Sequence, residues 1–512
     1  MRLVSCAAVV WLGCGGGGGH VEPPARPASD AELDLPLVEQ VARMEAGTLR
    51  SADVTRGYLA RIEQRDRGAS GVHAYLSLAP DAPAQAAAVD GKRGHGALLQ
   101  GAVIGVKDNI DTARLATTAG SLALAGNVPA SDAPIVAKLR AANAVIVGKT
   151  NLSEWANFRS TKSTSGWSSA GGQTIHATKP GYNPCGSSSG SAVAVRAGTA
   201  SATLGTETDG SIVCPASING VVGFKPTVGL VSRTGIVPIS ATQDTAGPIT
   251  KTVADAARVL HVIAGRDPAD PATAAIPATL DLDFEAALGK ASLQGVRLGV
   301  VKPASFDVKT LAVFDRACEQ LTAAGAVLVA VKLPEVKTLD DDELAILLYE
   351  FKDGINAYLA SHARAGQAKT LAELIAFDTA NAAKVMPYFQ QEIFEQAQAT
   401  AGLSDPKYVD AKRRARTVTL DNGIAAVLAA DKLDALIAPT QGPAWKIDYA
   451  KGDVFSGSSS QFAAVAGAPH LTVPMGDVDG FPVGLSVFGK PWDDGRVLAI
   501  GHAYEQLPYR LR

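Results

Sequence analysis

Two serine-containing segments decide how this chain is interpreted: Gly-Ser-Ser-Ser-Gly-Ser at residues 186–191 and Gly-Thr-Glu-Thr-Asp-Gly-Ser at residues 205–211. A third segment, Gly-Val-Lys-Asp at residues 105–108, lies upstream of both. None of the three contains a histidine, so the imidazole that usually activates a serine is not locally available. Lys107 is therefore the candidate base for a serine nucleophile.

Lys107 follows a short apolar run at residues 101–106 that is typical of a buried strand. Burial disfavours the ammonium form and lowers the pKa of lysine, which an amine requires before it can accept a proton. A lysine at the end of a strand more often extends its ammonium group into solvent, so Lys107 by itself does not decide between the two interpretations.

The serine segments supply the other groups that such a reaction needs. Residues 186–191 place four hydroxyls on a backbone whose glycines allow close approach, and one of these hydroxyls can relay a proton. Residues 208–211 offer consecutive N–H groups around a hydroxyl, an arrangement that stabilises a tetrahedral oxyanion while the adjacent Oγ attacks a carbonyl. A serine in a tight turn or at a helix N-cap is the plainer alternative for Ser211. The backbone N–H groups expected to form the oxyanion hole are those of Thr208, Asp209, Gly210 and Ser211.

Taken together, the three segments resemble the amidase signature family, whose members hydrolyse amides with a lysine and two serines. The resemblance implies that Lys107 is the base, Ser187 the bridging residue and Ser211 the nucleophile that forms a covalent acyl-enzyme. It also implies a cis peptide bond between Gly186 and Ser187 and no cofactor. Further segments match family landmarks: Val-Gly-Lys-Thr-Asn at 147–151, Gly-Phe-Lys-Pro-Thr at 223–227, Asp-Thr-Ala-Gly-Pro at 244–248 and Gly-Leu at 484–485.

Two residues near the nucleophile depart from the commonest family pattern. Asp209 stands where that pattern has glycine, and Val213 stands where it has arginine. The form of residues 205–215 is similar to that of bacterial peptide amidases, which remove ammonia from C-terminal peptide amides. A peptide amide is therefore the expected substrate, with fatty-acid or aryl amides as the alternative within the family. A preference of Asp209 for cationic substrates is left open.

Three other interpretations compete with this one. Residues 186–190 also satisfy the nucleophile-elbow pattern of α/β-hydrolase esterases, with Ser188 attacking and a C-terminal histidine such as His502 as base. That elbow needs a strand directly before it, which the Lys-Pro-Gly-Tyr-Asn-Pro sequence at 179–184 disfavours. A binding protein that keeps the scaffold without turnover is the second alternative. The amidotransferase subunit of the same family is the third alternative. It is disfavoured because it works with cytoplasmic partners, whereas we expect this chain to be exported.

The pattern of apolar residues predicts an α/β fold with one large domain at residues 34–512. Apolar residues recur at helical spacing over residues 35–63, which favours two amphipathic helices. Short apolar runs alternate with helical segments, so we expect a central, mostly mixed β-sheet with helices on both faces. Residues 340–431 are rich in alanine and helical in period, and they predict a helical insertion. Runs expected to be strands lie at 101–106, 144–147, 202–204, 298–301, 326–331, 436–438 and 471–473.

Composition excludes several classes of function. The chain has 512 residues, of which 47% are hydrophobic and 19% charged, so it can bury a large core. Its formal net charge is -3 and it contains no run of Lys or Arg, so we expect no nucleic-acid partner. Gly-Lys-Thr at 148–150 does not form a phosphate-binding P-loop, because Asn143 occupies the position that requires glycine.

The N-terminus predicts export. Arg2 precedes an apolar stretch at residues 3–12 that is too short to span a bilayer, which is typical of a cleaved signal. Leu-Gly-Cys-Gly at 12–15 resembles a bacterial lipobox, in which Cys14 would be lipidated and attach the protein to a membrane. We therefore expect an export signal at 1–14, a flexible tether at 15–33, and a periplasmic or membrane-anchored lipoprotein. An ordinary cleaved signal peptide is the alternative.

The remaining cysteines and the histidines indicate no further site. Cys185, Cys214 and Cys318 are too few for a disulfide framework. Cys185 and Cys214 flank Ser187 and Ser211 and could lie close in space, but packing as small apolar residues is expected for this pair. The eight histidines are scattered and form no metal-ligand spacing, so no metal site is expected.

Overall fold

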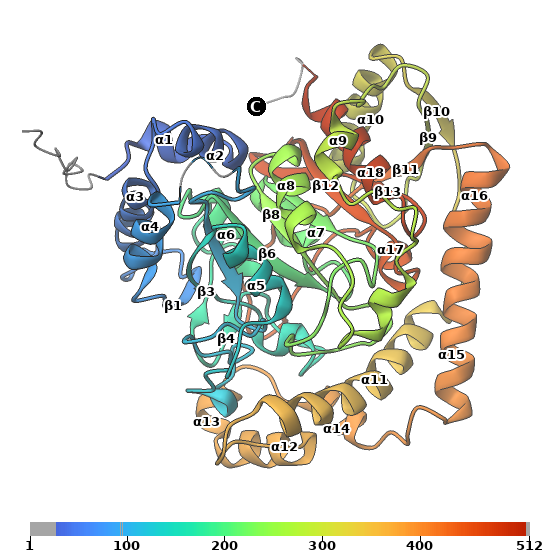
Figure 1. Ribbon diagram of the computed structural model, residues 1–512. Coiled ribbons are helices and arrows are strands. Elements are labelled where there is room, and N and C mark those ends of the chain that lie inside the picture. Colours follow the sequence, from blue (N-terminus) through green and yellow to red (C-terminus); the bar gives the residue numbers. More distant parts are fainter. Residues whose placement is uncertain (1–26, 93, 95, 508–512) are drawn as a thin grey trace, which may run out of the picture.

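An eleven-stranded mixed sheet forms the centre of the computed structural model, which describes residues 27–92, 94 and 96–507 (Figure 1). The order of strands across it is β1-β3-β2-β6-β8-β7-β12-β13-β11-β9-β10. The strands are β1 (Tyr75–Leu78), β2 (Val103–Lys107), β3 (Val145–Thr150), β6 (Ala202–Glu207), β7 (Val222–Lys225), β8 (Thr245–Thr250), β9 (Arg297–Val300), β10 (Val327–Ala330), β11 (Ala435–Pro439), β12 (His470–Val478) and β13 (Phe481–Phe488). The short strands β4 (Trp167–Ser168) and β5 (Gly172–Gln173) form a separate hairpin.

The sheet is parallel in two places and antiparallel between them. Strands β3, β2 and β6 are parallel to one another, as are β11, β9 and β10, whereas the pairs from β6 across to β11 are antiparallel. The predicted α/β fold with one large domain and a mixed sheet is confirmed.

Helices cover the sheet and extend below it (Figure 1). The helices outside the predicted insertion are α1 (Asp30–Asp34), α2 (Leu37–Glu45), α3 (Ser51–Arg65), α4 (Ala82–Asp90), α5 (Pro134–Ala141), α6 (Ser189–Arg196), α7 (Val213–Asn219), α8 (Val253–Ile263), α9 (Phe284–Leu288), α10 (Val308–Ala323), α17 (Gln461–Val465) and α18 (Asp494–Glu505). The two helices expected within residues 35–63 are present as α2 and α3.

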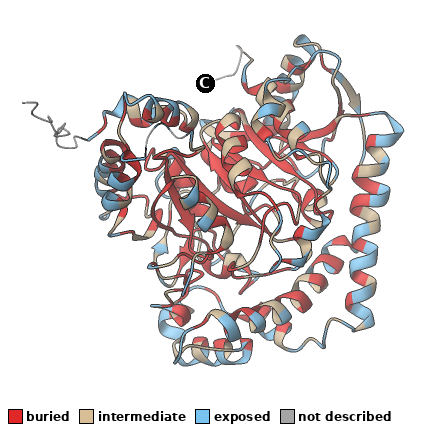
Figure 2. Ribbon diagram, viewed as in Figure 1, coloured by how far each residue is buried: buried red, intermediate tan, exposed pale blue. Residues whose placement is uncertain are grey.

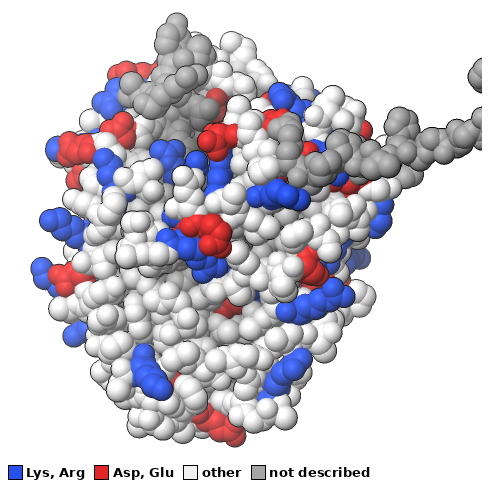
Figure 3. Space-filling view, turned by 90° about the vertical axis from the view of Figure 1, so that its left-hand side faces the viewer, with Lys and Arg blue, Asp and Glu red and all other residues white. Residues whose placement is uncertain are grey.

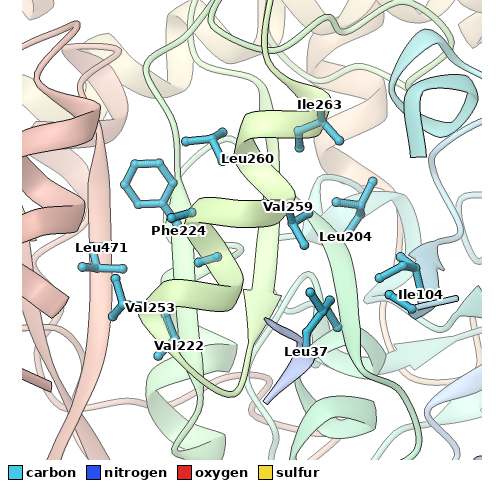
Figure 4. Packing of buried hydrophobic residues seen from close by; sticks show 14 of the residues in the cluster. Leu37, Ile104, Leu204, Val222, Phe224, Val253, Val259, Leu260, Ile263 and Leu471 are labelled. Atoms are coloured by element: carbon cyan, nitrogen blue, oxygen red, sulfur yellow. The ribbon is translucent and has the colours of Figure 1, made fainter. Parts of the chain in front are cut away.

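The main core lies between the sheet and the helices that cover it. Helix α8 shows why: the Thr252 side chain accepts a hydrogen bond from the Asp255 N–H at its start, and its apolar face is buried. Val253, Val259 and Leu260 of this helix lie over Phe224 of β7 (Figure 4). The buried residues in Figure 2 accordingly concentrate in the sheet and on the helix faces turned toward it.

The parallel pairing of β2 with β6 positions the candidate residues. Ile104 is opposite Ala202, and Val106 is opposite Leu204. Because the carboxyl ends of parallel strands meet at one edge, Lys107 comes to lie beside the last residues of β6.

Residues 339–430 are helical and lie along one side of the sheet, below and to the right of it in Figure 1. The helices are α11 (Leu339–His362), α12 (Leu371–Ala380), α13 (Ala382–Val385), α14 (Glu392–Gln398), α15 (Pro406–Arg416), a π-helical segment (Thr417–Ile424) and α16 (Ala425–Ala430). Phe351 of α11 and Phe394 of α14 stack on each other, and Phe394 also meets the Trp155 ring edge to face. These helices therefore have a second apolar core of their own, which includes residues of the main body.

Arg159 forms ion pairs with residues of both the helical segment and the main body. Its fully buried guanidinium lies 3.0 Å from the Glu154 carboxylate and 4.0 Å from that of Asp378 on α12. Its Nη1 donates to the carbonyl of Val385 at 2.7 Å, and it lies over the ring of Phe389. A buried charge needs ion pairs and hydrogen bonds, and Arg159 obtains ion pairs from both parts and one hydrogen bond through Nη1, while its Nε and Nη2 have no hydrogen-bond partner among the described residues.

The folded body begins before residue 34, so the predicted tether is too long at its C-terminal end. Ser29 and Glu32 form a capping box that starts α1. Arg61 of α3 holds this helix with ion pairs of 2.6 Å to both Asp30 and Asp34. The predicted signal at 1–14, including Cys14, and tether residues 15–26 lie outside the described residues.

The described surface mixes charges of both signs. On the face drawn in Figure 3, the described Lys and Arg side chains alternate with Asp and Glu rather than gathering in one region. None of the helices in the described part of the chain is long and apolar enough to cross a membrane.

Candidate active site

The Lys107 amine is fully buried and lies beside the Ser187 hydroxyl. Its Nζ is 2.8 Å from Oγ of Ser187, 2.8 Å from Oγ1 of Thr206 and 3.2 Å from the Thr206 carbonyl. The strand pairing described above explains this, because β2 and β6 end together. Lys107 and Ser187, 80 residues apart in the chain, are thus brought into hydrogen-bond contact.

Burial lowers the pKa of Lys107 to about 7, while the more distant carboxylates of Asp244 and Glu207 act in the opposite direction. A lysine with its ordinary pKa near 10.5 would be almost fully protonated at neutral pH. The shifted amine is neutral in a large fraction of molecules, so it can accept a proton.

Thr206 and Asn109 complete the surroundings of the amine, and no sequence motif singles out either residue. The side-chain amide of Asn109 donates to Oγ1 of Thr206 at 3.0 Å. A neutral amine has two hydrogens and one lone pair. When Nζ donates its hydrogens to the two Thr206 oxygens, its lone pair points to Ser187. Asn109 and Thr206 are therefore positioning residues. In the sequence, Asn109 directly follows the Gly-Val-Lys-Asp segment, and Thr206 is the first threonine of the Gly-Thr-Glu-Thr-Asp-Gly-Ser segment.

Ser187 and Ser211 lie on neighbouring loops. The peptide bond between Gly186 and Ser187 is cis, as the family resemblance implies. The N–H of Ser188 donates to the carbonyl of Ser211 at 3.1 Å, and the N–H of Ser153 donates to the carbonyl of Ser187 at 3.1 Å. Ser187 is fully buried between Lys107 and these contacts, whereas Ser211 is 9% exposed and lines a cavity.

Glu207 holds the loop that contains the nucleophile candidate. Its buried carboxylate accepts the N–H groups of Ile212 and Val213 at 2.7 and 2.9 Å, at the start of α7, and also interacts with the N–H of Gly210. In the described chain, the N–H groups of Asp209 and Ser211 have no hydrogen-bond partner, and both residues line the cavity.

The cavity over Ser211 has a volume of about 660 Å³. Thr208, Asp209, Gly210 and Ser211 all contribute to its wall. The helical segment 339–430 contributes Asp340, Leu347 and Ile393, and the loop before α17 contributes Trp445, Asp453 and Phe455. Asp453 fixes this loop, because its carboxylate accepts from the Ser165 N–H at 3.0 Å and from the Asn183 amide at 2.9 Å.

Cys185 and Cys214 form a disulfide, so the expectation of simple apolar packing is wrong for this pair. Cys185 lies two residues before Ser187 and Cys214 three residues after Ser211, and both line the cavity. The bond thus joins the two loops that hold the serines. Counting cysteines did not predict this disulfide, because three thiols do not define a set of disulfide bonds. One bond can still form when the fold brings two of the cysteines together. Cys318 is free.

The arrangement does not fit the esterase alternative. Ser188 is fully buried and its Oγ donates to the Thr206 carbonyl at 3.0 Å, so it is a structural group rather than an exposed nucleophile. Residues 183–186 form no strand before it. His502 lies on α18, with its ring 3.9 Å from the Glu505 carboxylate, and makes no contact with Ser188 in the described structure.

Lys149 and the acidic groups around it are structural. Its buried Nζ donates to the Ile110 carbonyl at 2.6 Å and to Thr117 at 2.8 Å, and it lies 3.6 Å from the Asp108 carboxylate. These contacts of Lys149 are all with other residues of the protein, which fits a structural role rather than phosphate binding. Over the described ranges, no group of three or more His, Cys, Asp or Glu side chains is arranged to hold a metal ion.

Known proteins resemble this chain over most of its length. The family model described as Amidase matches residues 53–498. A probable amidase from Arabidopsis thaliana is 38% identical over 450 residues, which cover 85% of this chain and 83% of that protein. A glutamyl-tRNA(Gln) amidotransferase subunit from Symbiobacterium thermophilum is 36% identical, with 90% of this chain and 94% of that protein covered.

A solved structure is similar as well. The crystal structure of native peptide amidase from Stenotrophomonas maltophilia superposes with a TM-score of 0.89 at 49% sequence identity. The alignment covers 93% of this chain and 97% of that one.

Proposed function

Because this chain belongs to the amidase family and is therefore an amide-hydrolysing enzyme, we propose that it deamidates C-terminal peptide amides through Lys107, Ser187 and Ser211. The observation on which the mechanism rests is the buried contact of 2.8 Å between Lys107 and Ser187, beside the loop of Ser211. The substrate class is proposed from the similarity to a peptide amidase over almost the whole chain.

The proposed reaction begins with proton transfers along the two serines to Lys107. Neutral Lys107 accepts the proton of Ser187, Ser187 accepts that of Ser211, and Oγ of Ser211 attacks the carboxamide carbon. The N–H groups of Asp209 and Ser211 stabilise the resulting oxyanion. The proton returns through Ser187 to the nitrogen, ammonia leaves, and water hydrolyses the acyl-enzyme ester to release the carboxylate and restore Ser211.

Ammonia release from matched substrates tests this proposal. Peptide amides, fatty amides and aryl anilides are incubated with the wild type and with Ser211→Ala. We expect release from peptide amides, and a loss of at least about 10³-fold in kcat for Ser211→Ala because the nucleophile is gone.

Ser188→Ala is the matched control, because that hydroxyl contacts only backbone and should retain turnover if the fold is kept. Preference for fatty amides or anilides would overturn the substrate assignment. Full activity of Ser211→Ala would overturn the mechanism. Failure of folded wild type to react with a serine-directed fluorophosphonate would also overturn it and would favour a scaffold without turnover.

We also propose export to the bacterial cell envelope, with Cys14 as the point of lipid attachment. The Cys185–Cys214 disulfide supports an oxidising compartment, since such bonds are rare in the cytosol. Mass spectrometry of the N-terminus of protein recovered from membranes tests this: a diacylated Cys14 supports the proposal, and an unprocessed Met1 contradicts it.

A further inference from the structure

The wall of the cavity over Ser211 contains acidic side chains. Asp209, Asp340 and Asp453 line it, and among the described residues that line it none is Lys, Arg or His. Glu343 of α11, which is 7% exposed and is not among the lining residues, is near enough to Asp209 to raise the pKa of its carboxyl group. A cavity lined by one sign of charge with low-dielectric walls concentrates ligands of the opposite sign.

Two of these carboxyl groups, those of Asp209 and Glu343, lack a cationic partner. Neither belongs to an ion pair in the described part of the chain. Oδ1 of Asp209 is buried there without a hydrogen-bond partner, and the other contact of its side chain is with Ser460. Each Glu343 oxygen accepts one amide N–H, from Gln243 at 2.8 Å and from Gln461 at 2.9 Å.

The groups that face this pair favour the protonated forms of both carboxyls, and a bound cation would favour the ionised forms instead. Burial raises the pKa of Asp209 well above its ordinary value, and the neighbouring Glu343 and Glu207 carboxylates act in the same direction. Burial also raises the pKa of Glu343, to which the Asp340 carboxylate contributes. Lys225 is the one described cation that acts on Asp209, and its effect is smaller than those of both glutamates.

We propose that Asp209 and Glu343 form a cation-selective subsite, which binds a positively charged side chain on the amino-acid residue that bears the scissile carboxamide. This inference rests on the proposed function. Asp209 is two residues from Ser211, so a side chain close to the reacting carbon is the part of the substrate within its reach. An ammonium or guanidinium would supply the missing partner and take the free Oδ1 as acceptor.

The same wall has a consequence for anionic ligands. A glutamate or aspartate side chain at that position would bring a further carboxylate beside this pair and would find no cation among the described lining residues, which disfavours binding. The subsite therefore discriminates in both directions: it favours basic residues and rejects acidic ones.

Isosteric substrate pairs test the role of charge alone. N-acetyl-arginine amide is compared with N-acetyl-citrulline amide, which has nearly the same shape without the charge, and N-acetyl-glutamine amide with N-acetyl-glutamate amide. A charge-assisted hydrogen bond to a buried group corresponds to about tenfold or more in affinity, so we expect that preference for arginine over citrulline, mainly in KM. Glutamate amide should be the poorest substrate of the four.

Variants identify the groups responsible. Asp209→Asn and Glu343→Gln keep the shape of each side chain and remove its charge, so both should bring the arginine-to-citrulline ratio close to one. Asp341→Asn is the matched control, because Asp341 is an exposed residue on the same helix outside the cavity wall and should keep the wild-type ratio. A ratio near one in the wild type, or a wild-type ratio in both Asp209→Asn and Glu343→Gln, would overturn the subsite.

A binding measurement separates this inference from the proposed function. Calorimetry with the full chain bearing Ser211→Ala compares N-acetyl-arginine amide with N-acetyl-citrulline amide without turnover. Tighter binding of the arginine compound, lost on adding Asp209→Asn, supports the subsite even if the mechanism fails. Equal binding of the two compounds contradicts the subsite even if peptide amides are hydrolysed through Ser211.

Discussion

At the scale of single residues, Lys107 determines the chemistry that is available. The apolar run before it allowed burial but did not decide against an ammonium group extended into solvent, and the structure buries the side chain fully. Its contacts with Thr206 could not be predicted from the sequence, because they depend on the parallel register of β2 and β6, which local periodicity does not define. Asn109 was missed for the same reason, since it acts through Thr206.

The pKa of Lys107 predicts how activity depends on pH. The amine must be neutral to accept the Ser187 proton, and burial lowers its pKa to about 7. As pH falls below 7 the amine becomes protonated, so kcat/KM should fall by about tenfold per pH unit, and it should level off above about pH 8. A pH profile on one neutral peptide amide measures this.

Lys107→Arg provides the comparison, because a guanidinium stays protonated and should be inactive over the whole range. A wild-type profile that is flat between about pH 5.5 and 8.5 would show that no such amine takes part.

At the scale of elements, the disulfide fastens the loop before α6 to the first turn of α7. The two cysteines are 29 residues apart in sequence, and the bond closes the loop that contains both serines. Closing a loop of this length restricts the unfolded chain and stabilises the folded state by about 3–4 kcal/mol. The sequence shows that each cysteine lies close to one of the two serines along the chain. No local sequence pattern shows that the fold brings the two cysteines together.

Removing the bond should therefore lower both stability and turnover. For the double variant Cys185→Ala with Cys214→Ala, we expect the free energy of unfolding to fall by about 3–4 kcal/mol, measured by denaturant titration. kcat should fall more than KM rises, because the serine loops lose their relative position. Cys318→Ser should change neither quantity, and a double variant as stable and active as the wild type would refute a positioning role.

At the scale of the whole molecule, a helical segment at residues 339–430 is attached to an α/β body and contributes to its cavity. Helical periodicity predicted this segment, because its amphipathic pattern persists without strand residues. The order of the eleven strands and the place where the segment meets the body could not be predicted, since both depend on contacts between residues far apart in the chain. Arg159 is one such contact, and its sequence surroundings give no sign of burial.

Arg159 should be important for the stability of the whole domain. In Arg159→Met the partly paired carboxyl groups of Glu154 and Asp378 would remain buried without a cation, which costs about 3–5 kcal/mol. Denaturant unfolding measures the loss. Arg413→Met removes an exposed arginine whose ion pair with Asp410 lies on the surface, so it should change stability by about 0.5 kcal/mol or less. Equal losses in the two variants would contradict the role of Arg159.

The covalent link beside the catalytic serines also affects how preparations of this enzyme are compared. In residues 27–92, 94 and 96–507, protein folded under reducing conditions and protein folded under oxidising conditions have the same sequence and differ in mass by two hydrogen atoms. In the described part of the chain the first presents three titratable thiols, and the second presents one, that of Cys318. Specific activities from different expression hosts are therefore comparable only after the thiol content of each batch has been measured.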